Sequence, residues 1–199
     1  MRHARPPGVL GRAEGLSPIP PWAERRRSAW RYVGQERPRF ATIPKPGEES
    51  VWDYPRPPRL EHDSRDVFVS VGGVAIARSN RCIRVLETST PPPIYVPMED
   101  VCSDVLEPAA STSLCEWKGE ATYWTVVTEE RRIERAGWSY AEPFPEFEPI
   151  RGWISFYPAL VECTLGGVRV APQPGVFYGG WVTPEIVGPF KGEPGSESW

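Results

Sequence analysis

The alternation of hydrophobic and polar residues becomes regular only after residue 66. Residues 67–71 and 74–77 are two β-prone runs separated by Gly72 and Gly73. Residues 160–165 and 168–170 repeat this arrangement around a second Gly-Gly pair. Two glycines between such runs are typical of a two-residue hairpin, because both turn positions then accept a positive φ. We therefore predict hairpins at both ends of a central fold.

Between these hairpins the pattern predicts further short strands. They cover residues 84–87, 94–97, 122–128, 138–140 and 152–157. One short helix is expected at residues 98–106, where Glu99 and Asp100 favour the positive end of the helix dipole. Closely spaced strands without long crossover helices indicate a mainly β fold, a compact antiparallel sandwich or a small barrel-like, tent-like sheet with one short helix.

The composition divides the chain into three parts. Its 25 prolines and 18 glycines favour loops and extended segments over long helices. Residues 1–66 are expected to form a proline-rich, basic and mostly irregular arm, residues 67–170 the core β domain, and residues 171–199 a Gly/Pro-rich extension packed on the core. Isolated aromatic residues in the arm predict that parts of it dock on the body; these are Trp22, Trp30, Trp52 and Tyr54.

Charge is distributed unevenly. Residues 1–39 hold nine arginines and three acidic residues, a charge of +6, and the remainder holds fourteen basic and twenty-three acidic residues, a charge of −9. Such an arm could bind nucleic acid or an anionic surface. A tail that is solvated, or that lies against its own acidic domain, explains it better, so a nucleic-acid partner is not expected. The oligomeric state is left open.

The cysteines and the apolar runs indicate the class of protein. Cys82, Cys102, Cys115 and Cys163 form no C-x-x-C unit, so a zinc site is disfavoured. Acidic residues near position 100 are better explained by a solvated helix face than by a metal site. No apolar run approaches membrane-spanning length, and residues near the start form no hydrophobic signal region. We expect a cytoplasmic protein with free thiols, no metal and no membrane association; any cofactor is unknown.

Candidate chemistry is concentrated in a few residues. Cys115 lies three residues before Lys118, and a nearby ammonium group favours the reactive thiolate. A buried structural cysteine is nevertheless the more common explanation for such a residue. The two histidines, His3 and His62, lie outside the expected core, so a Ser-His-Asp or Cys-His arrangement lacks a base. Glu87, at the end of an apolar strand, is either an acid–base residue or a paired structural carboxylate.

Several motifs together resemble one family. They are the segments 76–79, RVLET at 84–88, PIYVP at 93–97, CEWKG at 115–119, ATYW at 121–124, AGWSY at 136–140 and FYP at 156–158. This order is similar to the family catalogued as domain of unknown function 427, in a longer form with matching flanks. The resemblance implies a compact β fold with no assigned general activity. Some members are labelled nucleotidyltransferases, but the paired D-x-D carboxylates of that class are absent here.

The resemblance also implies a pocket. The family residues map to Glu87, Tyr95, Cys115, Lys118 and Gly119, and we expect Glu87, Cys115 and Lys118 to be catalytic. Tyr95, Gly119, Tyr123, Trp138 and Tyr140 are the candidate ligand-binding residues, although Gly119 could serve only a turn and the aromatic residues only the core. Two hypotheses follow: an enzyme acting on a small polar or nucleotide-like molecule, or a non-catalytic module that binds a small molecule or another protein.

Overall fold

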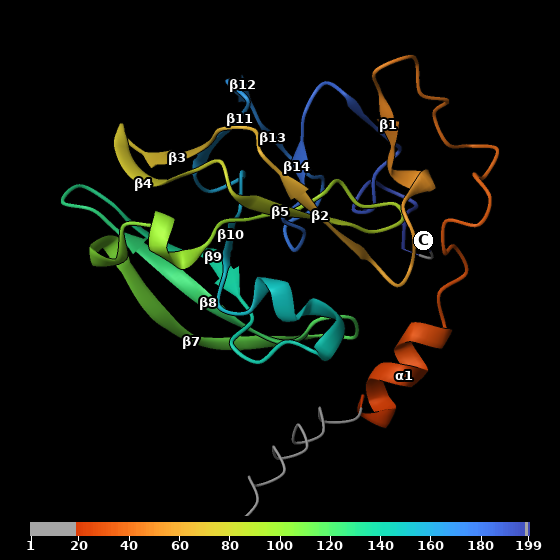
Figure 1. The fold of residues 1–199 in the computed structure, drawn as a ribbon, viewed down its shortest axis with the longest axis horizontal. Coiled ribbons are helices and arrows are strands. Elements are labelled where there is room, and N and C mark those ends of the chain that lie inside the picture. The colour runs from red at the N-terminus through yellow and green to blue at the C-terminus, as the bar shows by residue number, and fades with distance from the viewer. Residues whose placement is uncertain (1–18, 198) are drawn as a thin grey trace, which may run out of the picture.

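The computed structural model describes residues 19–197 and residue 199, and most of its regular structure is β (Figure 1). The strands are β1 (Glu49–Ser50), β2 (Arg59–Asp63), β3 (Val67–Val71), β4 (Val74–Ser79), β5 (Cys82–Leu86), β6 (Ile94–Tyr95), β7 (Leu106–Cys115), β8 (Gly119–Val127), β9 (Arg132–Ser139), β10 (Ile154–Phe156), β11 (Glu162–Leu165), β12 (Val168–Arg169), β13 (Ala171–Pro172), β14 (Trp181–Val182) and β15 (Ile186–Val187). The helices are α1 (Pro21–Ser28) and the 3₁₀ turns η1 (Val51–Asp53), η2 (Met98–Asp100), η3 (Ser103–Val105) and η4 (Pro145–Ile150).

The two predicted Gly-Gly hairpins are confirmed, and they meet in one sheet. Gly72 and Gly73 connect β3 to β4, and Gly166 and Gly167 connect β11 to β12, all four with positive φ. Because β11 also pairs with β3, the sheet has the order β12-β11-β3-β4. Segments about 90 residues apart in the chain are therefore hydrogen-bonded neighbours (Figure 1).

A second four-stranded sheet, in the order β10-β9-β8-β7, lies opposite (Figure 1). In β8, Ala121, Tyr123 and Thr125 are buried at alternate positions, as expected for a strand with one face toward the core. The outer strand β7 contains Pro108 and has an irregular register between Pro108 and Thr112. An edge strand tolerates a proline, because one row of its amides has no partner strand.

A third sheet, β2-β5-β6, connects these two sheets. Two small sheets have two strands each: β1 pairs with β15, and β13 pairs with β14. All pairings between these strands are antiparallel except the two-residue pair β1–β15. The predicted fold class is confirmed: the described residues form several antiparallel sheets with one short α-helix, and no sheet among them closes into a barrel. No helix in this part of the chain is long and apolar enough to cross a membrane.

The helix predicted at residues 98–106 is wrong. The segment forms the 3₁₀ turns η2 and η3, and Leu106 already begins β7. The amide of Cys102 donates to the carbonyl of Ile76 at 2.8 Å, and Val101 bridges to Ala77, so the backbone follows β4 instead of coiling. A nine-residue segment also offers few helical bonds to offset the cost of starting a helix.

The arm is more ordered than its sequence predicted. Residues 1–18, with His3, lie outside the described residues, but α1 begins at Pro21 and β2 pairs with β5 before residue 67. A proline in the first helical turn and arginines in the last both favour a helix there. As expected, the arm docks through aromatic residues, with Trp52 and Tyr54 buried and Trp30 half-buried.

The core has three parts, of which the smallest surrounds Trp52 and includes Leu86 and Ile186. A cluster rich in valine and isoleucine, which includes Val69 and Ile154, fills the space between the two four-stranded sheets and receives Trp181 from the C-terminal segment. An aromatic cluster gathers around Tyr95 and Trp138. The aromatic cluster forms the base of the candidate site.

Candidate functional site

A cavity of about 260 Å³ opens where the end of β5 faces the turn between β7 and β8. Its walls come from distant parts of the chain, including the arm and the C-terminal segment. The lining residues are Trp30, Glu87, Thr90, Pro93, Tyr95, Ser113, Leu114, Cys115, Glu116, Trp117, Lys118, Ala121, Tyr123, Trp138, Tyr140, Tyr157, Gln173, Phe177, Tyr178, Gly179, Gly180 and Lys191.

The structure brings seven of the eight predicted site residues to this cavity. These are Glu87, Tyr95, Cys115, Lys118, Tyr123, Trp138 and Tyr140. Gly119 does not line it. With φ at +98°, Gly119 begins β8 after a tight turn, a conformation that residues with a side chain rarely adopt. Its role in the geometry is therefore to form the turn that places Lys118.

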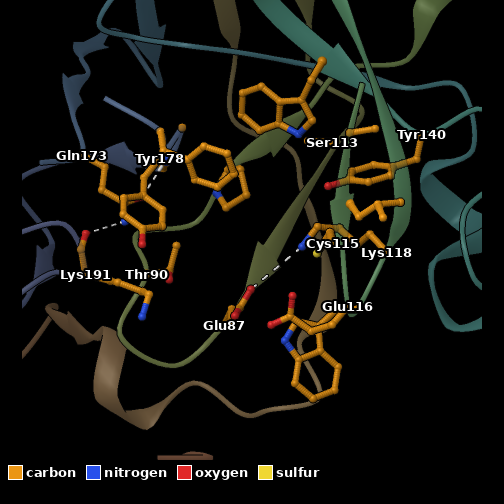
Figure 2. Close-up of a pocket in the computed structure, with 18 of the residues that line it drawn as sticks. Glu87, Thr90, Ser113, Cys115, Glu116, Lys118, Tyr140, Gln173, Tyr178 and Lys191 are labelled. Atoms are coloured by element: carbon orange, nitrogen blue, oxygen red, sulfur yellow. Dashed lines mark hydrogen bonds and ion pairs between the residues drawn. The ribbon is translucent and has the colours of Figure 1, made fainter. Parts of the chain in front are cut away.

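Two turns position the candidate catalytic side chains. Glu87 follows β5 and bridges to Thr90, which starts the proline segment leading to β6. Cys115 is the last residue of β7, and Lys118 ends the turn into β8. Figure 2 shows Cys115 and Lys118 together on one side of Glu87, with the Lys118 ammonium directed at its carboxylate.

Glu87 lies between two cations. Its Oε1 accepts from Arg56 Nε at 3.3 Å, and its Oε2 lies 3.9 Å from Lys118 Nζ. The Arg56 side chain is fully buried and also donates to the carbonyls of Tyr32 and Thr88, each at 2.9 Å. Arg56 is thus fixed by the backbone, and Glu87 is held in the cavity lining by an ionic cluster with Arg56 and Lys118.

Lys118 is a buried cation. Burial disfavours its charge, but Cys115 and Glu87 outweigh this effect and hold the pKa of Lys118 above its ordinary value. Only 7% of the residue is exposed, and Glu87 at 3.9 Å is its one ion-pair partner among the described residues. A protonated lysine in this position can stabilise negative charge but cannot act as a base or an amine nucleophile.

Phenol and indole groups form the inner wall. Trp138 Nε1 donates to the Tyr95 hydroxyl at 2.9 Å, and the two rings meet edge to face. Burial raises the pKa of Tyr95 to about 12, and burial together with Cys115 raises that of Tyr140. These hydroxyls therefore remain neutral at physiological pH and can both donate and accept hydrogen bonds.

The arm closes one side of the mouth. Trp30 Nε1 donates to Glu116 Oε1 at 2.8 Å, and the Arg56 guanidinium lies 3.9 Å from the centre of the Trp30 ring. Arg27 of α1 donates to the main-chain carbonyls of Glu116 and Trp117 at 2.6 and 3.1 Å. Both residues therefore hold the turn between β7 and β8.

The C-terminal segment forms a neighbouring side of the mouth, in contact with Trp30. Gln173 Nε2 donates to the Lys191 carbonyl at 2.8 Å, and the Lys191 amide donates to the Ser89 carbonyl at 2.8 Å, which ties this segment to the turn after Glu87. The ammonium of Lys191 binds the main-chain oxygen of Trp199 and lies 4.5 Å from the centre of the Trp30 ring. Burial, reinforced by the charge of Arg56, lowers the pKa of Lys191.

Sequence reasoning did not assign Trp30, Arg56, Glu116 or Lys191 to the site. One signal was present in the composition: the chain has only three lysines, and two of them, Lys118 and Lys191, line this cavity. His62 lies in β2, exposed and outside the lining. The described residues contain no group of His, Cys, Asp and Glu side chains suited to hold a metal ion.

The arrangement combines an aromatic wall with charged groups at the mouth. Neutral phenols suit a planar or polar molecule, and Lys118 offers fixed positive charge beside a thiol and a carboxylate. The four cysteines are free. Burial raises the pKa of Cys163, and it raises the pKa of Cys82 to about 11, so both buried thiols stay protonated near neutral pH. Cys115, half-buried, is the thiol that the cavity exposes.

Comparison with known proteins identifies the family. A family model described as Domain of unknown function (DUF427) matches residues 59–167, more than half of the chain. The matched segment contains Glu87, Cys115 and Lys118, whereas Trp30, Arg56 and Lys191 lie outside it. A search of curated proteins gave no match. By this match and by the order of its motifs, the chain belongs to the DUF427 family.

Proposed function

We propose that the chain is an enzyme that acts on a small polar or nucleotide-like molecule bound in the cavity. The observation that supports this proposal is that the candidate catalytic side chains converge on one cavity. Glu87, Cys115 and Lys118 come from the ends of two strands and from a turn, yet all three line one cavity with an aromatic wall. Such a combination of titratable groups in a concave site is typical of an active site.

Each group has a role that its surroundings permit. Lys118, held as a cation, stabilises negative charge on the substrate as the reaction proceeds. Glu87 exchanges protons with the substrate. Cys115 is either the nucleophile or a support for Lys118. The phenols of Tyr95, Tyr123 and Tyr140, with Trp138, bind the body of the molecule.

A second candidate is a non-catalytic binding module, and one observation favours it. The Glu87 carboxylate is shared by Arg56 and Lys118, an arrangement that could serve only to fix the fold. In that case the cavity binds a ligand without transforming it. The two candidates differ in turnover and not in binding.

The test begins with a thermal-shift screen of nucleotides, amino acids and other metabolites, because a ligand that binds the native state raises the melting temperature. Turnover of each hit is then measured in Glu87→Gln and Lys118→Met variants. Glu99→Gln and Lys45→Met make the same changes at exposed positions outside the lining. The enzyme proposal expects roughly 100-fold slower turnover in Glu87→Gln and Lys118→Met. Turnover in the control variants Glu99→Gln and Lys45→Met should equal that of the native chain. Hits that bind without turnover, or turnover that survives both site variants, would favour the binding module.

A further inference from the structure

Two adjacent residues of the turn between β7 and β8 carry hydrogen-bond donors that find no acceptor in the part of the chain that the structure describes. Lys118 is 93% buried, and its ammonium has three N–H groups. The Glu87 carboxylate oxygen is 3.9 Å away, beyond hydrogen-bond distance, and the centre of the Phe147 ring is 5.6 Å away. Trp117 is 3% exposed, and its Nε1 has no acceptor within the described residues. Both residues line the cavity. A buried donor without a partner costs free energy of about 1–3 kcal/mol, so the Trp117 N–H calls for a specific explanation. The ammonium of the adjacent Lys118 is not closed off in this way, and it is a second donor available to a ligand in the cavity.

We propose that this turn is an anion-binding subsite: the substrate carries a carboxylate or phosphate group that accepts hydrogen bonds from the Lys118 ammonium and the Trp117 indole N–H. The inference rests on the proposed function, since it takes the cavity to be a substrate site. It adds the charge class of the substrate and a binding residue, Trp117. Both donors need an acceptor, which an anionic group supplies and a cationic or purely apolar ligand does not.

The position of the turn is fixed before any ligand arrives. Arg27 donates to the carbonyls of Glu116 and Trp117, and its guanidinium lies 5.0 Å from the centre of the Trp117 ring. The amide of Phe144 donates to the Lys118 carbonyl at 3.1 Å. Contacts from two other segments therefore hold the backbone of both donor residues, as expected for a preorganised binding site.

The carboxylates near the turn do not oppose an anion strongly. Glu87 is neutralised by Arg56, and Glu116 accepts a hydrogen bond from Trp30. Lys191 adds a second positive charge to the lining, on the far side of Glu87 from Lys118 in Figure 2. Counting Arg56 with the lining, three cations therefore accompany two carboxylates.

The test uses the full chain and two pairs of probes that share a planar ring but differ in charge: benzoate with benzamide, and phenyl phosphate with phenol. Affinities are measured by calorimetry, and the indole N–H signals are followed by NMR, with the Trp117 signal assigned from a Trp117→Phe variant. We expect one or both anions to bind and to shift the Trp117 signal, while the neutral probes bind at least roughly tenfold more weakly. The anion that binds distinguishes a carboxylate from a phosphate substrate.

The variants separate this inference from the proposed function. Trp117→Phe replaces the indole by a smaller aromatic ring that has no N–H donor, and it should weaken anion binding roughly tenfold, as should Lys118→Met. Trp153→Phe and Lys45→Met, at positions outside the lining, should leave binding unchanged. The inference is overturned if no probe binds in a charge-dependent way or if Trp117→Phe binds the anions as the native chain does. Loss of turnover in Glu87→Gln bears on the proposed function alone.

Discussion

The Tyr95 hydroxyl illustrates how one buried polar atom orders the wall of the site. Tyr95 is fully buried, and its oxygen is the acceptor for Trp138 Nε1. Tyr95→Phe keeps the ring but leaves the indole N–H without an acceptor, and we expect it to lower the free energy of unfolding by about 1–3 kcal/mol. Urea denaturation measures this. In a Trp138→Phe background the same change should cost less, because the donor is already gone; equal costs in both backgrounds would contradict the account.

The two lysines of the cavity should titrate in a definite order. Lys191 has its pKa lowered by burial and by Arg56, whereas Lys118 is held above its ordinary value of 10.5 despite burial, chiefly by Cys115 and Glu87. With ¹³C-labelled lysine, NMR should therefore show Lys191 losing its proton at a lower pH than Lys118, with signals assigned from Lys→Arg variants. Because folding raises the pKa of Lys118, its protonated form stabilises the folded chain. This contribution is complete below about pH 10.5, the ordinary pKa, and it is lost as the pH climbs through the raised pKa. Deprotonation of Lys118 first would contradict the described electrostatics.

At the scale of elements, α1 contacts the turn between β7 and β8 and helps to fix its position. Arg27 supplies two hydrogen bonds to that turn and an ion pair with Glu146. Arg27→Ala should expose residues 19–33 to faster hydrogen exchange and proteolysis and reduce stability by about 1–3 kcal/mol. Arg25→Ala is the matched control, because Arg25 is an exposed residue of the same helix. If both variants exchange alike, Arg27 does not hold the arm.

Prediction from sequence succeeded for elements that depend on local signals. The Gly-Gly turns were predictable because a positive φ at two successive positions nearly requires glycine. Strand β7 was missed because Pro108 and a run of small polar residues hide its alternation, and the acidic residues near position 100 indicated a helix instead. The pairing of Cys102 with Ile76 decided that segment, and a tertiary hydrogen bond of this kind leaves no trace in the local pattern.

At the scale of the whole molecule, the difference between local signals and long-range contacts also explains which site residues were predictable. Glu87, Cys115 and Lys118 were predictable from motifs that resemble a family, and the cavity does contain them. Trp30 and Lys191 are far from these motifs in sequence, and only the folding of both terminal segments onto the core brings them to the mouth. Their contribution depends on long-range docking, which neither periodicity nor spacing encodes.

Trp52 connects both terminal segments, and this leads to a prediction about the whole molecule. It is 1% exposed, packs edge to face on Tyr32 of the arm and on Trp199 with ring centres 5.3 and 5.2 Å away, and donates from Nε1 to the Pro189 carbonyl at 2.9 Å. Trp52→Ala should lower the free energy of unfolding by about 3–5 kcal/mol, measured by urea denaturation followed by circular dichroism. Leu160→Ala, at an exposed apolar position, should change it little.

The same variant tests whether the cavity depends on this connection. Trp52 does not line the cavity, yet Trp30 and Lys191 both belong to segments that it anchors. If docking of these segments completes the site, Trp52→Ala should also weaken binding of whichever anionic probe the native chain takes, measured without denaturant while the protein is still folded. Trp52→Phe, which keeps a ring in the cluster, should restore much of the stability and the binding together. A large loss of stability with unchanged binding would show that the segments anchored by Trp52, with Trp30 and Lys191, contribute packing but no part of the ligand site.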